Sequence, residues 1–468
     1  MFNKIAKNIL TIFLLVLFNL IVLNKVTTTH LAHAEVSAIK IFISGDIEKA
    51  RAVFKKELLQ AEQSKNKNEI WRTLINLAWF EDEVSQHRKA IEYSNKALEI
   101  ANNLNDQYKI GKSLCWLGWA NTRLGLYELA LSFYENAIEI GAPNGEIKYP
   151  SVWGLALQET GSIYFKMGDT TGAKKRLEKT HNYAVNNKLD IAITEGGAHL
   201  AEIALSEGNF AKAKEYALQA VRAGTKCNCS NYNLGKAKVV LAKVTLETNK
   251  YRYRAKEIIN ETLQFCEQKK LPRCKSEAKL LLSDTLDKKN FTKRFELVEQ
   301  AFMELANHES ELRGSAEASL GRVFLDNSKV ELAEFYLKNG LKINQELFRK
   351  VANTHVNLSI AELEGLKGDK KKELQTLSDT IDKALETNSL PVALKAQQKM
   401  IENLKSAGFK KMAYERSNQA IELINKLIKK SQGTIKESEF RELYFKIYRE
   451  RAALGVQNYG DSKDASNF

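Results

Sequence analysis

Apolar residues recur three and four positions apart along most of the chain, and small turn-forming residues interrupt them about every 40 residues. Spacings of three and four place side chains on one face of an α-helix. The interruptions form a regular series: Gly45, Ser85, Gly125, Gly168, Gly208, Asn249, Asn290, Ser328, Gly368 and Gly408. A fixed period of about 20 to 50 residues is typical of stacked supersecondary units. The pattern therefore predicts an all-α chain of repeated helical hairpins.

The segment around Gly125 illustrates one predicted hairpin. Apolar or small residues lie at helical spacing before this glycine, and a second such stripe follows it: Leu114, Leu117, Gly118, Ala130, Tyr134 and Ala137. Glycine supplies the positive φ that ends the first helix. Small residues at equivalent offsets in other segments allow two helix axes to approach closely.

The four prolines test this phasing independently. A proline inside a helix costs about 3 kcal/mol, so it belongs in a connection or a first helical turn. All four fall between one predicted hairpin and the next: Pro143, Pro150, Pro272 and Pro391.

This pattern resembles the tetratricopeptide repeat, and the segment from Gly111 to Asn144 matches it best. The resemblance extends over about residues 35–425. It implies a right-handed α-solenoid of about ten hairpins. The units of about 40 residues exceed the usual 34 of the family. They are similar to the longer variant found in kinesin-light-chain-type arrays.

The predicted organisation is a solenoid over residues 35–430 followed by a terminal helix over residues 431–455. Thr434 and Glu437 have the spacing of a capping box, which opens a helix. Such a helix covers the exposed core of the last repeat with one apolar face: Phe440, Leu443, Tyr444 and Ile447. We expect the polar tail, residues 456–468, to be disordered.

The first 34 residues have the pattern of a secretory signal peptide. Lys4 and Lys7 precede an apolar run over residues 9–23, and Ala32 and Ala34 supply the small residues of a cleavage site. We expect cleavage between Ala34 and Glu35, and export to a periplasm or to the outside. The run is shorter than the roughly 20 residues that span a bilayer, although an uncleaved anchor is an alternative.

The formal charge of the whole chain is +14, with 71 Lys and Arg against 57 Asp and Glu. The basic residues are dispersed along the chain. We interpret them as a solvated surface and expect neither a nucleic-acid partner nor a stable membrane anchor after cleavage.

Four cysteines fall in two successive connections between predicted hairpins: Cys227, Cys229, Cys266 and Cys274. In an oxidising compartment they predict one or two disulfides. We favour links between the two connections, because a bridge between residues two apart is strained. Free thiols and a zinc site are alternatives. Cys115 is expected to be a buried apolar residue.

The sequence contains no motif for a catalytic, metal or cofactor site. Glu195 and His199 lie four residues apart, but no further ligand motif accompanies them, so we expect a surface pair. The chain is predicted not to be an enzyme and to require neither a metal nor a cofactor.

The resemblance also implies where a partner binds. In this family the first helix of each hairpin lines the concave surface, and the family's inward positions carry over to seven residues here: Arg72, Trp79, Lys112, Trp119, Arg123, Gln158 and Lys166. They predict a groove for a protein or peptide with apolar and acidic side chains. Burial of the tryptophans in the core is the alternative.

We therefore predict an exported, non-catalytic scaffold that binds a protein or peptide partner in its concave groove. The alternative function is a sensory or regulatory module acting on a separate signalling chain. Self-association through a second copy of the chain is a further alternative.

Overall fold

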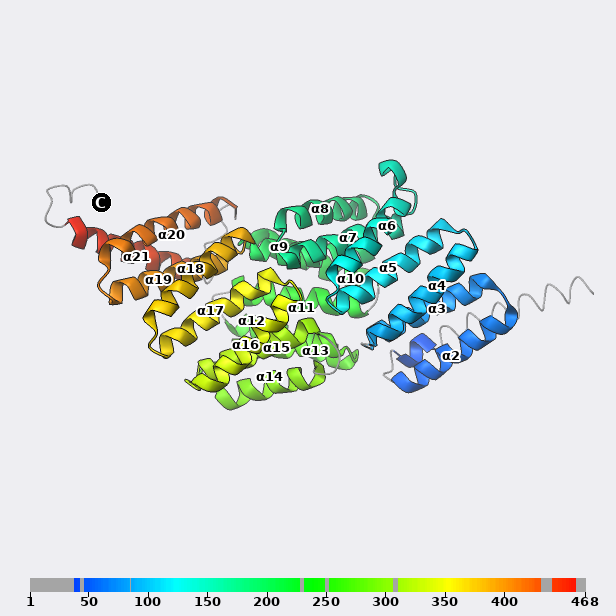
Figure 1. The fold of residues 1–468 in the computed structure, drawn as a ribbon, viewed down its shortest axis with the longest axis horizontal. Helices are drawn as coiled ribbons and strands as arrows, with labels where there is room; N and C mark the ends of the chain where they lie inside the picture. Colours follow the sequence, from blue (N-terminus) through cyan, green and yellow to red (C-terminus); the bar gives the residue numbers. More distant parts are fainter. Residues whose placement is uncertain are drawn as a thin grey trace, which may run out of the picture. The chain divides into compact units, whose positions relative to one another are not determined.

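The computed structural model describes residues 38–42, 46–84, 86–227, 231–248, 252–305, 310–430 and 440–459. In these ranges the chain is helical and contains no β-strand (Figure 1). This confirms the predicted all-α class. The signal peptide, the capping-box residues and the last residues of the tail lie outside the described part.

Each predicted turn residue separates the two helices of a pair. The early pairs are α3 (Lys67–Glu83) with α4 (His87–Asn103), α5 (Gln107–Arg123) with α6 (Tyr127–Gly141), α7 (Pro150–Met167) with α8 (Thr170–Asn186), and α9 (Asp190–Ser206) with α10 (Phe210–Lys226). The later pairs are α11 (Asn231–Thr248) with α12 (Arg252–Gln268), α13 (Pro272–Thr285) with α14 (Phe291–Leu305), α15 (Ser310–Leu325) with α16 (Val330–Glu346), α17 (Lys350–Leu366) with α18 (Lys370–Glu386), and α19 (Leu390–Ser406) with α20 (Lys410–Lys430). A helical segment at residues 38–42 precedes α2 (Ile47–Ser64), and α21 (Phe440–Tyr459) follows α20.

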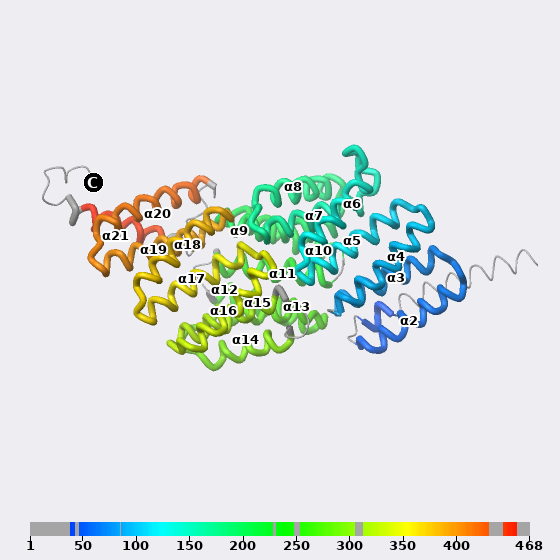
Figure 2. Tube along the Cα trace, in the orientation of Figure 1, coloured from blue at the N-terminus to red at the C-terminus, as the bar shows by residue number. Residues whose placement is uncertain are grey.

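The chain forms two compact units, residues 1–116 and residues 117–468, whose boundary falls inside α5. Figure 2 traces the chain through both units. The first unit has its own core, in which Phe54, Leu77 and Phe80 are completely buried. The second unit contains the helices from α6 to α21.

The glycine turns have the predicted left-handed backbone. Gly125, Gly168 and Gly208 have φ of 77°, 98° and 73°. After Gly168 and Gly208, the next side chain accepts a hydrogen bond from the backbone N–H three residues further on: Asp169 accepts from Gly172, and Asn209 accepts from Lys212. These two turns therefore end one helix and cap the next, whereas Leu126 after Gly125 makes no side-chain cap. Gly45, Ser85 and Asn249 lie outside the described residues.

A second left-handed residue, found at the connections between hairpins that the structure fully describes, was not predicted. It lies between hairpins, and in several repeats it is not glycine: Lys65, Asn105, Lys188, Lys270, Phe348 and Asn388. The prolines behave as expected, since Pro150, Pro272 and Pro391 lie in the first turn of α7, α13 and α19, and Pro143 begins the short 3₁₀ helix η1 (Pro143–Gly145).

Inside each hairpin, a small residue of the first helix lies against a large residue of the second. A Cβ added to Gly161 would lie 2.8 Å from Cγ of Leu177. Equivalent positions in other hairpins place Gly118 against Tyr134 and Gly321 against Leu337. These distances are shorter than van der Waals contact, so only glycine fits there without movement.

The second unit also folds back onto itself. Thr170 Oγ1 donates a 2.8 Å hydrogen bond to the carbonyl oxygen of Thr387, 217 residues away in sequence. Nearby, Asn388 Nδ2 donates to Glu207 Oε1 at 2.9 Å, and Gly125 approaches Leu347. We call this set of contacts the seam. It joins the turns after α5, α7 and α9 to the connections before α17 and α19.

Helix α21 packs against α20 at the end of the array. Tyr444 and Ile447, on the face predicted to cover the last repeat, are 6% and 0% exposed and belong to the core that α19 and α20 share. The helix runs to Tyr459, beyond the end predicted at residue 455.

The disulfide pairing differs from the favoured prediction. Cys266 and Cys274 are bonded to each other, with their Cα atoms 5.6 Å apart. A link from either residue to the preceding connection is therefore wrong, because the end of α12 and the start of α13 already place these two cysteines within bonding distance. Cys227 is also in a disulfide, and Cys229 lies outside the described residues. Cys115 is completely buried, as predicted.

Among the residues that the structure describes, no helix combines the length and apolarity needed to cross a membrane.

Substitution of Gly161 by Ala tests the close contact inside the hairpin. We expect Gly161→Ala to lower the free energy of unfolding by about 1–3 kcal/mol, because the new methyl group overlaps Leu177. Gly154 lies in the same helix with no atom within 4 Å of an added Cβ. Gly154→Ala should therefore stabilise the protein by up to about 1 kcal/mol through helix propensity. Chemical denaturation measures both, and equal effects would contradict the contact.

Substitution of Gly125 by Ala tests the seam. Gly125 and Gly368 both have positive φ, so alanine strains either turn. However, only Gly125 has a neighbour, Leu347, at 2.1 Å from an added Cβ. We expect Gly125→Ala to cost about 1–3 kcal/mol more than Gly368→Ala. Adding Leu347→Ala should remove most of this difference, and a double-mutant cycle without coupling would show that the seam contact is absent.

Candidate functional site

The first helices of successive pairs lie next to one another and form one layer, which we call the inner face. In the second unit this layer consists of α7, α9, α11, α13, α15, α17 and α19, and each helix contacts the next. Helix α7 also contacts α17. The inner face is therefore the surface around which this unit closes.

Polar side chains link three neighbouring helices of the inner face in a first rung. The carboxylate of Glu195, on α9, accepts a hydrogen bond from Gln158 of α7 at 3.1 Å and another from Asn233 of α11. Both carboxylate oxygens of Glu195 are thereby satisfied by amide donors.

A second rung lies one helical turn further along α9. Nζ of Lys236, on α11, is 2.8 Å from Nε2 of His199. The carboxylate of Glu159, on α7, is 3.8 Å from the same imidazole nitrogen. Because His199 is only 5% exposed, this charged rung is buried inside the protein.

The two rungs shift the pKa values of their carboxylates in opposite directions. Burial and the nearby charge of Glu159 raise the pKa of Glu195 to about 7. Burial also opposes ionisation of Glu159, but the contact with His199 and the charge of Lys236 outweigh it and lower the pKa of Glu159 to about 2. Burial and the charge of Lys236 lower the pKa of His199, and burial also lowers the pKa of Lys236.

A row of charged residues follows the inner face beyond these rungs. Its members lie six residues before the turn residues of the later hairpins, from Gly208 to Gly408. Trp79 and Trp119 occupy the same position before Ser85 and Gly125. We call these charged residues the inner charge row: Glu202, Lys243, Asp284, Arg322, Glu362 and Glu402. Lys243 lies 3.8 Å from Glu202, and Arg322 lies 3.4 Å from Asp284. These two pairs of row members therefore face one another across adjacent helices.

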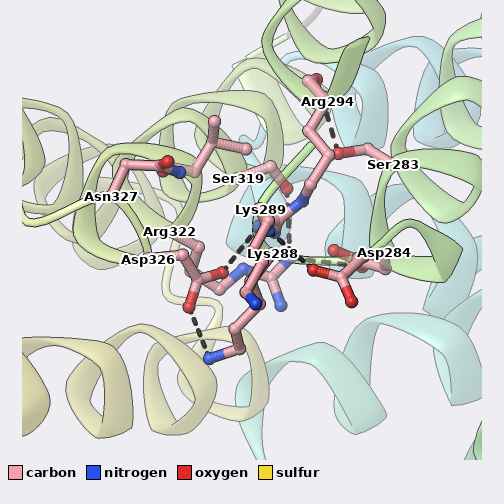
Figure 3. Close-up of polar contacts among 11 residues, drawn as sticks. Ser283, Asp284, Lys288, Lys289, Arg294, Ser319, Arg322, Asp326 and Asn327 are labelled. Carbon is pink, nitrogen blue, oxygen red and sulfur yellow. Dashed lines mark hydrogen bonds and ion pairs between the residues drawn. The ribbon is translucent and has the colours of Figure 1, made fainter. Parts of the chain in front are cut away.

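Figure 3 shows the part of the row where α13 and α15 meet. Arg322 donates to Asp284 and also, at 3.2 Å, to the hydroxyl oxygen of Ser319. Beside it, Asp326 pairs with Arg294 at 2.9 Å and with Lys288. The turns of two successive hairpins are thus joined by ion pairs.

Side chains from distant inner helices also meet. Lys395, on α19, is 3.5 Å from Glu247 of α11, which precedes it by 148 residues. The charge of Lys395 is the main cause that lowers the pKa of Glu247. Burial, Lys395 and Lys243 together lower the pKa of His355 of α17 to about 4. The inner sides of α11, α17 and α19 therefore face one another.

A pocket of about 700 Å³ lies on the same side at the end of the array. It is lined by residues of α19 and α21: Gln398, Leu443, Phe445, Lys446 and Arg449. Lys446 also pairs with Glu402, the last member of the inner charge row. The charged surface thus continues into a hollow that is partly apolar.

The structure places three of the predicted binding residues in the first unit. Arg72 is exposed on α3, and Lys112 is partly buried on α5. Trp79 is partly buried and packs edge-on against Phe42, with ring centroids 5.6 Å apart. Trp79 therefore contributes to the core of this unit.

The other four predicted residues belong to the second unit. The guanidinium of Arg123 lies over the rings of Trp119 and Tyr232 and bonds the Tyr232 hydroxyl. Lys166 lies over the ring of Tyr127. Gln158 is buried in the first rung. The structure thus groups Trp119 with Arg123 and assigns Gln158 a bridging position.

The expectation of a surface pair at Glu195 and His199 is wrong. Both side chains point along the inner face, where they join neighbouring helices. The positions of Glu159, Lys236 and the inner charge row were also missed. The 40-residue period would have located the row, because the inward position carried over to Trp79 and Trp119 continues at this interval into the later repeats.

The described part of the chain contains no group of three His, Cys, Asp or Glu side chains arranged to hold a metal ion.

Comparison with protein families identifies a tetratricopeptide repeat at residues 111–141. No curated protein sequence matches the chain. Among solved structures, a Rap protein complexed with competence and sporulation factor matches with a TM-score of 0.57 and 16% identity, covering 79% of this chain and 99% of that one.

Two further structures resemble the chain more weakly. The apo form of RapI has a TM-score of 0.43 at 14% identity, covering 59% of this chain and 99% of that one. A human IFIT1 dimer with PPP-AAAA has a TM-score of 0.44 at 14% identity, covering 90% of this chain and 89% of that one.

The family match identifies one tetratricopeptide repeat, at residues 111–141. The similarity to the Rap protein shows that the chain has an all-helical repeat fold of the same kind.

The opposite pKa shifts of the two carboxylates predict opposite pH dependences of stability. Glu195 holds its proton in the folded state above its unfolded pKa of about 4.5, so its contribution to stability falls as the pH rises towards 7. Glu159 stays ionised in the folded state, so its contribution is present above about pH 4.5 and is lost as the pH falls towards 2.

As the pH rises from about 5 to about 8, we expect the free energy of unfolding of Glu195→Gln to increase relative to that of the unmodified protein. As the pH rises from about 3 to about 5, we expect that of Glu159→Gln to decrease relative to the unmodified protein. Chemical denaturation across this range gives both profiles. Parallel profiles for the two variants would show that the carboxylates do not have these environments.

Proposed function

We propose that this protein is an exported, non-catalytic scaffold that binds a segment of a protein or peptide on the inner face of its second unit. The observation that carries the proposal is the set of partly exposed charged side chains that successive inner helices present to the same side. The side chains of Lys243 and Lys395 are 48% and 43% exposed although they face other inner helices.

The aromatic and basic group at the start of this face supports the same function. Trp119, Arg123 and Tyr232 combine stacking surface with a cation, which suits a segment that carries apolar and acidic side chains. The pocket beside α21 supplies a second partly apolar hollow. The Rap protein of similar fold is itself complexed with a factor.

Export is part of this proposal and rests on the sequence of residues 1–34. A basic start, an apolar run and small residues at positions 32 and 34 match a signal peptide with cleavage before Glu35. The Cys266–Cys274 disulfide is consistent with an oxidising compartment.

Crosslinking mass spectrometry on the tagged full chain in its native compartment tests the proposal. We expect crosslinks from Lys243 and Lys395 to one partner segment. The variant Lys243→Glu should weaken capture of that partner by about tenfold or more, because it replaces a cation by an anion where acidic side chains of the partner bind.

The matched control is Lys342→Glu on the outer helix α16, where Lys342 is 76% exposed and lies 3.9 Å from Glu346. It makes the same charge change away from the inner face and should leave capture unchanged. Partner crosslinks confined to outer helices, or equal loss in both variants, would contradict binding on the inner face.

A further inference from the structure

The turns of the second unit differ in what lies against them. At Gly125, Gly168 and Gly208, an added Cβ would lie 2.1 Å, 2.9 Å and 2.2 Å from a side chain of a later repeat. At Gly368 and Gly408, no atom of the described residues lies within 4 Å of an added Cβ. The turns of the last two hairpins therefore face open space.

These open turns lie along one edge of the array. The first helices of the last three hairpins, α15, α17 and α19, contact one another in order. Nζ of Lys367, at the end of α17, lies 2.6 Å from Oε2 of Glu334 on α16, which joins two successive hairpins beside their turns. We call the three segments around these turns the late edge: residues 328–332, 366–372 and 405–412.

Lysine is concentrated on the late edge. The three segments contain eight lysines and only two acids, Glu331 and Asp369. Three of the lysines pair with glutamates outside the segments, at Glu334, Glu364 and Glu373. The remaining five lysines outnumber the two acids by three. The edge therefore carries an excess of positive charge that its own ion pairs do not neutralise.

Three of these lysines are placed where the fold gains nothing from them. Lys371, Lys410 and Lys411 are exposed, and no carboxylate in the described part of the chain pairs with them. They lie in the first turns of α18 and α20, where the helix dipole disfavours cations. Stability of the helices therefore does not account for them, and their charge is available to an anionic surface.

Large apolar side chains are exposed among the same lysines. Each segment contributes at least one, with exposed fractions of 45% for Leu332, 52% for Leu366, 54% for Phe409 and 53% for Met412. Phe409 and Met412 directly flank the two lysines at the start of α20. Apolar side chains next to lysines form the kind of surface that binds an anionic bilayer, because the apolar groups enter the boundary of headgroups and acyl chains while the lysines meet lipid phosphates.

We propose that the late edge binds the surface of a membrane that contains anionic lipids. Leu366, Phe409 and Met412 enter the headgroup region, and the unpaired lysines lie against lipid phosphates. A soluble polyanion would satisfy the lysines but leave the apolar side chains in water, whereas a bilayer accepts both. Such binding is peripheral and needs no membrane-spanning helix. It is independent of a partner on the inner face.

Co-sedimentation of the protein with lipid vesicles tests the inference. The protein is purified from its native cells, and the vesicles consist of phosphatidylcholine alone or with about 30% phosphatidylglycerol. Each lysine close to an anionic surface strengthens binding about fivefold. We therefore expect about tenfold or greater preference for the anionic vesicles. Residues 1–34 are the same in all variants, so differences between variants report the late edge alone.

The lysine variant is Lys410→Glu/Lys411→Glu. It should weaken binding to anionic vesicles by about tenfold or more, because it replaces two cations by anions at the membrane surface. The matched control, Lys55→Glu/Lys56→Glu, makes the same charge change at two adjacent exposed lysines of α2 in the first unit. It should leave binding within about twofold, because salt screens distant charges.

The apolar variant, Phe409→Ser/Met412→Ser, keeps every charge. It should weaken binding by about fivefold or more, because it removes the side chains that enter the headgroup region. The control Leu59→Ser/Met303→Ser replaces apolar residues that are 58% and 70% exposed on α2 and α14, and it should retain binding. Circular dichroism checks that all four variants stay folded.

Equal binding to the two kinds of vesicle would overturn the inference, as would equal losses in the lysine variant and its control. Full binding by the apolar variant would also overturn it, because the edge would then recognise negative charge alone, as on a soluble polyanion or an acidic protein. The proposed function is judged separately, by crosslinks from Lys243 and Lys395, which none of these variants changes.

Discussion

The contact between a small residue of one helix and a large residue of the next sets the geometry of the whole array. Gly161 against Leu177 leaves no room for a methyl group. The two helices of the hairpin consequently approach closely and present their remaining faces to neighbouring hairpins. Because this contact recurs in several hairpins, each first helix takes the same place in the repeat. The inner face follows from this repetition.

The inner face combines buried and accessible charge in different places. In the rungs around His199, burial makes ionisation of Glu195 unfavourable, and amide donors satisfy its carboxylate. Along the inner charge row, Glu202 pairs with Lys243 at 3.8 Å and Arg322 with Asp284 at 3.4 Å, and all four side chains are partly exposed. The rungs therefore join α7, α9 and α11, and the row joins later helices of the same face by more exposed pairs.

The seam brings together parts of the second unit that are far apart in the sequence. Early turns of this unit contact connections that follow about 200 residues later, through Thr170, Glu207 and Gly125. Such contacts bring α11 and α19 close enough for Lys395 to reach Glu247. A closed unit of this kind presents its charges in a fixed arrangement.

The sequence by itself determined the class of fold, the period, the positions of the turns and the containment of the prolines, because each depends on local backbone preference and helical spacing. The groove predicted at Trp79 and Trp119 from the family resemblance stays a prediction, and the structure packs Trp79 against Phe42 in the core of the first unit. The tertiary structure alone decided which cysteines pair, that Glu195 and His199 lie on the inner face, and that turns distant in sequence meet at the seam. The cysteine pairing depends on how α12 and α13 meet at one connection. The inner face and the seam depend on how hairpins stack over the whole second unit, and no local pattern of residues records that.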